Sequence, residues 1–148
     1  MKVLLIEDDQ NKSKQIVDFF SSEFPGQEIL LKRSYQSGLK EIMTNNFSFI
    51  LLDMQLPNFD ISSGEDGYKF RKLAGIDILK EIQRKKIVCK VIIVTQFETF
   101  GEKESFIELA DLKKIIRTQY SEIYIDTVFY SADKSIWKRQ LKDLIEKL

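Results

Sequence analysis

Three acidic residues follow directly on the first apolar run of this sequence. The run reads Val-Leu-Leu-Ile at residues 3–6, and Glu7, Asp8 and Asp9 come next. Adjacent negative charges repel one another, so they need a compensating partner. That partner can be a helix N-terminus, a nearby Lys or Arg, or a metal ion.

Two later apolar runs also end in oxygen-bearing side chains. Asp53 follows residues 49–52, and Thr95 follows residues 91–94. Carboxylate oxygens are the ligands that Mg²⁺ accepts, with water filling the rest of its octahedron. An aspartate beside such a cation can attack a phosphoryl group and form an aspartyl-phosphate, and a hydroxyl can donate a hydrogen bond to a phosphoryl oxygen. These residue types therefore favour Mg²⁺-assisted phosphoryl transfer.

The composition excludes several other chemistries. The 148 residues contain no histidine, which rules out a Ser-His-Asp triad and a histidine-ligated zinc site. Neither G-x-x-x-x-G-K-[ST] nor G-x-G-x-x-G occurs, so the common phosphate-binding loops are missing. The 23 Lys and Arg balance 23 Asp and Glu, and this zero net charge gives no support for direct nucleic-acid binding.

Hydropathy and cysteine usage indicate the compartment. The apolar runs are far shorter than the ~20 residues needed to span a bilayer, and the N-terminal residues do not resemble a signal peptide. The single cysteine, Cys89, fits a reducing environment and is expected to be a small buried hydrophobic residue. We therefore expect a cytoplasmic protein with no membrane association.

Short apolar runs alternate with segments of helical spacing along the chain. The runs predict strands, mostly buried on both faces, at residues 3–6, 29–31, 49–52, 91–94 and 123–129. The helices are marked by Ile16, Phe20 and Phe24; Leu39, Ile42 and Met43; Ile76, Leu79 and Ile82; Leu109, Leu112 and Ile116; and Trp137, Leu141, Leu144 and Leu148. This alternation favours a doubly wound α/β domain whose parallel sheet has helices on both faces. We expect a single domain over residues 1–148.

In such sheets, ligands bind outside the carboxyl ends of the strands. That rule places Glu7, Asp8, Asp53 and Thr95 at one rim of the predicted sheet. Asp9 comes next to the first helix and is expected to be its N-cap.

The sequence resembles the response-regulator receiver domain, the phosphoacceptor half of two-component signalling. The resemblance rests on four stretches in the family's order: VLLIEDD at 3–9, FILLDMQLP at 49–57, GIDILKEI at 75–82 and VIIVT at 91–95. It implies a flavodoxin-like, five-stranded parallel sheet of order 2-1-3-4-5. It also implies a regulatory protein and not an enzyme, beyond its own phosphorylation and dephosphorylation.

The resemblance assigns roles to individual residues. Glu7 and Asp8 match the acidic pair that binds Mg²⁺, and Asp53 matches the phosphorylated aspartate, itself a metal ligand. Gln55 falls where a backbone carbonyl completes the metal shell. Thr95 matches the switch hydroxyl.

The first departure from the family is a missing lysine. The family carries it at the end of the fifth strand, where it pairs with the phosphate; that position falls here on Tyr130 or Ser131. Losing such a charge-assisted hydrogen bond costs about 1.5–3 kcal/mol. Lys134, in the first turn of the last predicted helix, is the nearest downstream substitute.

The second departure is an inserted loop at about residues 58–74, where the family has only a few residues. A long loop beside a chemical site is usually functional, so we consider a lid over the acidic pocket, a docking surface and a disordered excursion. As a lid, the loop could supply the missing cation from Lys69, Arg71 or Lys72.

The third departure follows the switch hydroxyl. Gln96 stands where the family has a small residue and could crowd access to the aspartate. The two positions at which the family tunes phosphate lifetime fall on Gln55 and Phe97. At the second of these positions, the Phe97 ring could shield the phosphoryl group from water.

We therefore expect a stand-alone, Mg²⁺-dependent receiver phosphorylated at Asp53. Its phosphate would come from a partner histidine kinase or phosphotransfer protein. Its output would pass through contacts with another protein. The sequence is also compatible with a homodimer. The alternative is a pseudo-receiver, a binding module that does not switch by phosphorylation, which the missing lysine and the long loops favour. A carboxylate-metal phosphatase or nuclease fits less well, because Gln55 stands where a second acid would be needed.

Overall fold

A computed structural model describes residues 1–61, 70–100 and 106–148 of the chain. Five strands in this part form one sheet in the order β2-β1-β3-β6-β9, and all neighbouring pairs are parallel. The strands are β1 (Lys2–Ile6), β2 (Glu28–Lys32), β3 (Phe49–Leu52), β6 (Val91–Thr95) and β9 (Tyr124–Phe129). This arrangement confirms the predicted fold class and strand order.

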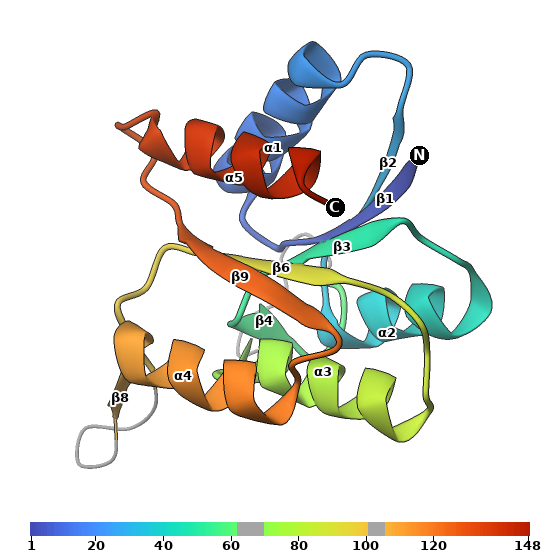
Figure 1. The fold of residues 1–148 in the computed structure, drawn as a ribbon, viewed down its shortest axis with the longest axis vertical. Coiled ribbons are helices and arrows are strands. Elements are labelled where there is room, and N and C mark those ends of the chain that lie inside the picture. The colour runs from blue at the N-terminus through green and yellow to red at the C-terminus, as the bar shows by residue number, and fades with distance from the viewer. Residues whose placement is uncertain (62–69, 101–105) are drawn as a thin grey trace.

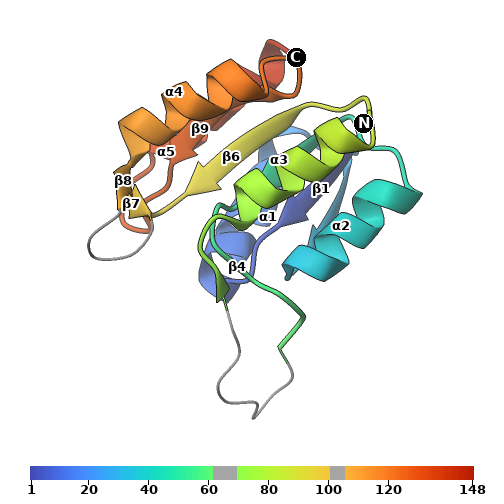
Figure 2. The ribbon, with the colours of Figure 1, turned by 90° about the horizontal axis from the view of Figure 1, so that it is seen from below.

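Helices cover both faces of the sheet, as Figures 1 and 2 show. One face carries the first and last helices, and the other carries the three between them. The helices are α1 (Gln10–Glu23), α2 (Tyr35–Thr44), α3 (Ala74–Arg84), α4 (Leu109–Gln119) and α5 (Ile136–Glu146). Phe24 and Leu148, which the apolar spacing placed on the first and last helices, lie just beyond their ends.

Alternation along the central strands divides the core into two layers. On β1, Val3 and Leu5 face α1 and α5, where they belong to the same buried cluster as Trp137. Leu4 and Ile6 point to the opposite face and belong to the cluster formed with α2, α3 and α4. Both faces of each inner strand are therefore buried, which explains the uninterrupted apolar runs in the sequence.

Two small antiparallel pairs add to this framework, and the sequence did not predict them. β4 (Leu56–Pro57) pairs with β5 (Phe70–Arg71), and β7 (Thr99–Phe100) pairs with β8 (Ile107–Glu108). The first pair joins the residues just before the predicted insertion to residues 70–71 within it, shortly before α3 begins. The second joins the chain after β6 to the start of α4.

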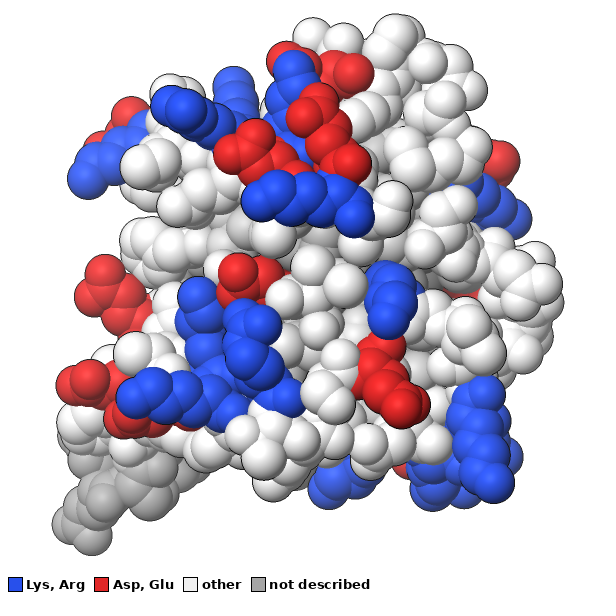
Figure 3. Space-filling model, in the orientation of Figure 1, with Lys and Arg blue, Asp and Glu red and all other residues white. Residues whose placement is uncertain are grey.

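Charged side chains lie beside the edge strand β9. Lys113 and Arg117 of α4 both form ion pairs with Asp126 of β9, at 3.3 and 3.2 Å. Figure 3 shows basic side chains gathered over α4 beside acidic ones. Charges at an edge strand oppose pairing with another sheet. No helix in the described residues is long and apolar enough to cross a membrane.

A close approach of α2 to β1 requires a glycine. A Cβ atom at Gly38 would lie 2.5 Å from Cδ1 and 2.9 Å from Cγ2 of Ile6, whose side chain is fully buried. The strand end that carries the acidic residues is therefore in direct contact with α2.

We expect Gly38→Ala to lower the free energy of unfolding by about 1 kcal/mol. Overpacking costs about 1–3 kcal/mol, which exceeds the ~1 kcal/mol gained by placing Ala instead of Gly in a helix. Urea denaturation measures the effect, and Lys40→Ala, on an exposed position of the same helix, is the control. The loss should shrink in an Ile6→Val background, which removes the Cδ1 atom; equal losses in both backgrounds would contradict this packing account.

Candidate functional site

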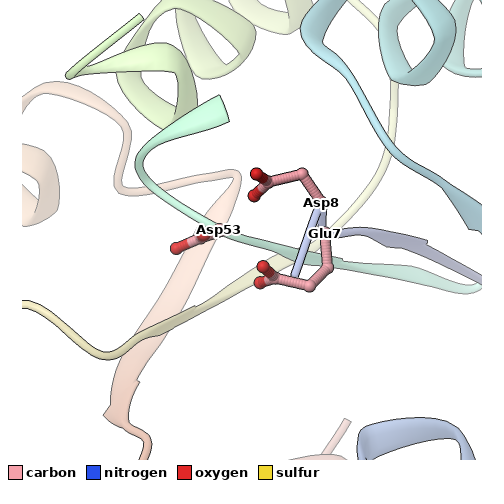
Figure 4. Close-up of side chains that lie close together, drawn as sticks. All are labelled: Glu7, Asp8 and Asp53. Atoms are coloured by element: carbon pink, nitrogen blue, oxygen red, sulfur yellow. The ribbon is translucent and has the colours of Figure 1, made fainter. Parts of the chain in front are cut away.

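The carboxyl ends of β1 and β3 bring three acidic side chains together. The two strands are neighbours with Ile6 opposite Leu52, and the Asp53 N–H donates to the carbonyl of Ile6 at 3.1 Å. Glu7 and Asp53 therefore leave adjacent strands at the same level. One carboxylate oxygen from each of Glu7, Asp8 and Asp53 lies within 4.8 Å of the other two, and Figure 4 shows the three carboxyl groups facing a common space.

The donor set of this cluster fits a small divalent cation. All three donors are carboxylate oxygens, and an octahedral Mg²⁺ with bonds of about 2.0–2.1 Å holds its ligand oxygens roughly 3–4 Å apart. Small side-chain adjustments would bring the observed oxygens to that spacing. Glu7 and Asp53 are 1% and 3% exposed, whereas Asp8 is only half-buried, so water can reach the site from the side of Asp8.

Burial and mutual repulsion make these carboxylates poor anions on their own. Burial, followed by the charge of Asp53, raises the pKa of Glu7 to about 8. The same two causes raise the pKa of Asp8 to about 6. Burial also raises the pKa of Asp53, against the lowering effects of Lys12 and the Met54 N–H. The cluster therefore lacks positive charge, which a divalent cation would supply.

Lys12 of α1 supplies part of that charge from within the fold. Its side chain is 1% exposed, and its Nζ lies 2.6 Å from Oε2 of Glu7 and 3.2 Å from Oδ1 of Asp53. The ammonium also donates to the backbone carbonyl of Val94 at 2.7 Å. Burial alone would lower the pKa of Lys12, but the two carboxylates outweigh burial and raise it, so this side chain stays protonated.

The sequence analysis did not identify Lys12, although the sequence carries a signal for it. Lys12 is four residues before Ile16 and eight before Phe20, so it lies on the apolar stripe that packs α1 against the sheet. A lysine on such a stripe, one turn after a strand that ends in acids, is placed to meet them. The start of the helix fixes this position, because Oδ1 of Asp9 accepts from the Lys12 N–H at 2.8 Å. Asp9 is therefore the N-cap, as predicted.

The loop after Asp53 is held by its own hydrogen bonds and by α3. The Met54 N–H donates to Oδ1 of Asp53 at 2.8 Å, and the Gly75 N–H donates to the carbonyl of Met54 at 3.0 Å. A Cβ atom at Gly75 would lie 3.2 Å from the carbonyl of Asp53, so this helix start packs directly against the loop. Gln55, whose carbonyl the resemblance assigns to the metal shell, follows in the same loop and is half-buried.

Thr95 lies fully buried at the carboxyl end of β6, next to the strand that carries Asp53. Its Oγ1 accepts from the Phe97 N–H at 3.2 Å, and its carbonyl accepts from the Tyr130 N–H at 2.7 Å. The Phe97 ring is 36% exposed and makes an edge contact with Phe100, with ring centres 6.5 Å apart. The hydroxyl is thus positioned by the turn that also places Phe97.

The expected lysine position falls on Tyr130, which is buried, or on the following residue, Ser131. Tyr130 directly follows β9, and its hydroxyl donates to Oε1 of Gln15 at 2.8 Å. Its ring packs on Trp137, with centres 5.2 Å apart, and its centre lies 5.8 Å from Nζ of Lys12. Ser131 instead donates to Asp133.

The other cations considered from the sequence lie elsewhere. Lys134 is exposed and lines a surface hollow with Gln15 of α1, and within the described residues no ion pair joins it to Asp53. Arg71 hydrogen-bonds to Asn58 and forms a 3.2 Å ion pair with Asp77. Its guanidinium also stacks on the Tyr35 ring of α2. Lys72 is exposed, and Lys69 lies outside the described residues. Cys89 is half-buried, and burial raises its pKa to about 11.

Comparisons with known proteins find related sequences over most of the chain. The family model of the response regulator receiver domain matches residues 3–116. The chain is 33% identical over 144 residues to the uncharacterized protein y4jR of Sinorhizobium fredii, covering 97% of this chain and 95% of that protein. It is 30% identical over 151 residues to the Detocs response regulatory protein DtcB of Enterobacter cloacae, covering 100% of this chain and 98% of that protein.

Solved structures of similar fold include two receiver proteins. The response regulator TrrA of Thermotoga maritima, solved in complex with Mg(2+)-BeF, is 20% identical, covers 97% of both chains and gives a TM-score of 0.60. The Francisella response regulator 1452 receiver domain is 24% identical, covers 99% of this chain and 97% of its own, and gives a TM-score of 0.57.

We expect Mg²⁺ to raise the melting temperature, and to do so more strongly at about pH 8 than at about pH 6. The folded-state pKa values of Glu7 and Asp8, about 8 and about 6, lie above their ordinary values of 4.5 and 3.8. The metal-free folded protein therefore holds protons that the unfolded chain releases, and it loses stability as the pH rises from about 4 through about 8. Metal binding needs ionised ligands, so the stabilisation that Mg²⁺ provides grows as the pH rises over the same range.

Thermal melts with and without Mg²⁺ across this pH range measure the effect. Asp8→Asn should remove most of the Mg²⁺ response, whereas Asp18→Asn, on the exposed face of α1, should leave it intact. A melting temperature that ignores Mg²⁺ at about pH 8 would contradict the metal assignment.

Proposed function

Because this chain belongs to the response-regulator receiver family, we propose that it is a Mg²⁺-dependent phosphoacceptor whose phosphorylated residue is Asp53. The observation that carries the proposal is the convergence of Glu7, Asp8 and Asp53, with carboxylate oxygens within 4.8 Å of one another at the carboxyl ends of β1 and β3. The TrrA protein, which has a similar fold, was solved in complex with Mg(2+)-BeF, and this supports a Mg²⁺-binding role for the present fold.

In the proposed reaction, an oxygen of Asp53 attacks the phosphorus of a phosphohistidine on another protein. The phosphorus–nitrogen bond breaks, its electron pair returns to the imidazole of the donor, and an aspartyl-phosphate forms. Since these 148 residues contain no histidine, the donor is another molecule, either a histidine kinase or a phosphotransfer protein. Hydrolysis by water restores the carboxylate and releases inorganic phosphate.

The residues around Asp53 divide the remaining tasks. Glu7, Asp8, Asp53 and the carbonyl of Gln55 would hold Mg²⁺, which when bound neutralises charge on the phosphoryl oxygens. Thr95 would donate a hydrogen bond from its hydroxyl to one of those oxygens. This new hydrogen bond would couple phosphorylation to the position of the turn that holds Phe97. We propose that the signal then passes to an output protein through direct contact, in the cytoplasm and without nucleic-acid binding by this domain.

A pseudo-receiver is the second candidate, and one contact favours it. Lys12 already pairs with Glu7 and Asp53 inside the fold, so two of the three acids have a counterion without any metal. Such a domain would keep a fixed surface for its partner. Phosphorylation distinguishes the two candidates.

We expect the wild-type protein to gain the mass of one phosphoryl group after incubation with acetyl phosphate and Mg²⁺. Asp53→Asn should gain none, because the amide cannot form an acyl phosphate, and Asp18→Asn should behave like wild type. Intact-protein mass spectrometry measures the adduct, and EDTA should prevent it. Absence of an adduct from acetyl phosphate, phosphoramidate and a phosphorylated histidine kinase would favour the pseudo-receiver.

We further expect Phe97→Ala to shorten the lifetime of the phosphorylated state several-fold. The Phe97 ring stands beside the turn that holds Thr95, where it would limit the approach of water to the phosphorus. Loss of the adduct after removal of the donor measures the rate. Phe106→Ala, on an exposed ring farther along the chain, is the control, and an unchanged rate in Phe97→Ala would remove the shielding role.

A further inference from the structure

Among the residues that the structure describes, the buried cation nearest to Asp53 comes from the first helix and not from the end of the last strand. Resting on the phosphoacceptor function proposed above, we infer that Lys12 is the phosphoryl-binding cation of this site and replaces a lysine at the Tyr130 position. Lys12 lies in α1, outside the four sequence stretches that carry the family resemblance.

The contacts of Lys12 meet the requirements for this role. Its Nζ is 3.2 Å from Oδ1 of Asp53, so a phosphoryl group added to that carboxylate would arrive within reach of the ammonium. The side chain is 1% exposed, which keeps water from screening its charge. An ammonium has three protons to donate, and they are now directed to Asp53, Glu7 and the carbonyl of Val94.

The surroundings of Tyr130 explain how the charge can arrive from α1. The Tyr130 side chain points back to α1, where its hydroxyl donates to Gln15 at 2.8 Å. Its ring is packed on Trp137 and has the Lys12 ammonium 5.8 Å from its centre, at cation–π distance. The Tyr130 side chain thus links the end of β9 to α1 and lies beside the Lys12 ammonium.

The contacts also indicate what would move on phosphorylation. A phosphoryl group on Asp53 would attract the ammonium away from Glu7 and toward the phosphoryl oxygens, and Glu7 would keep its role as a metal ligand. The bond from Lys12 to the Val94 carbonyl lies one residue before Thr95. Movement of Lys12 would therefore act on the same end of β6 as the Thr95 hydroxyl does.

Titration with beryllofluoride in saturating Mg²⁺ tests the inference, because this ion binds aspartate as a phosphoryl mimic without transferring a group. Lys12→Met should bind beryllofluoride about tenfold to a hundredfold more weakly than wild type, as expected for loss of a charge-assisted hydrogen bond. Its affinity for Mg²⁺ alone should be retained or increased, because a competing positive charge has been removed. Lys14→Met, on the exposed side of the same helix, and Lys134→Met should bind both ligands like wild type.

A charge-relocation variant separates this role from a structural one. Lys12→Met combined with Tyr130→Lys returns the ammonium to the end of β9 and should recover most of the beryllofluoride affinity. A merely structural Lys12 would not be replaced in this way. The matching measurement on the unsubstituted protein is the ¹⁵Nζ resonance of Lys12. This resonance should shift on beryllofluoride binding, and the ¹⁵Nζ resonance of Lys134 should stay unchanged. The inference can therefore be tested even if a variant fails to fold.

The outcomes distinguish the two levels of the proposal. Wild type that binds neither Mg²⁺ nor beryllofluoride overturns the phosphoacceptor function, and the inference with it. Wild type that binds both, together with an unaffected Lys12→Met or an unshifted Lys12 resonance, overturns the inference alone.

Discussion

An ammonium held between two buried carboxylates is the interaction on which the site depends. Transferring isolated charges into a protein interior costs several kcal/mol for each ion, and close pairing with good hydrogen bonds is needed to offset that cost. Lys12 makes such contacts with Glu7 and Asp53, and a backbone carbonyl accepts from it as well. With Asp8 added, the acids outnumber the cation, and a divalent ion can take the place of the protons that the metal-free site holds.

This pairing constrains elements far apart in the sequence. β1 and β3 must be neighbours in parallel for Glu7 and Asp53 to emerge side by side. The helix that follows β1 must begin within a few residues, and the Asp9 cap fixes that start, so that Lys12 returns over the same rim in the first turn. Trp137 of α5 and Tyr130 at the end of β9 pack on each other, and the Tyr130 ring lies beside Lys12. The α1–α5 face of the sheet is thus tied to the site by one lysine.

The parts of the fold that could be predicted are those with periodic or positional signals. The runs buried on both faces predict parallel strands, and the strand-end rule places Glu7, Asp8 and Asp53 at a common rim, where the structure also has them. The two-residue strands β4, β5, β7 and β8 were missed because such short segments carry no period. Lys12 was missed for another reason. Its role follows only when two facts are joined: the side of α1 that faces the sheet, and the place of Lys12 on the stripe of Ile16 and Phe20.

The contrast between the acids and the lysine follows from the physics of their interactions. Metal ligands must meet a small ion at fixed distances and angles, so their positions on the strand ends are tightly constrained. A lysine contributes a compact charge at the end of a flexible stem, and its electrostatic attraction depends on distance but little on the direction of approach. The same charge can therefore be supplied from α1 or from β9. The family match, which covers residues 3–116 and ends before β9, includes the acids, Thr95 and Lys12 but not Tyr130. In the proposed switch, the charge that senses the phosphoryl group is anchored to the Val94 carbonyl, so the response begins between α1 and β6 and not at the end of β9.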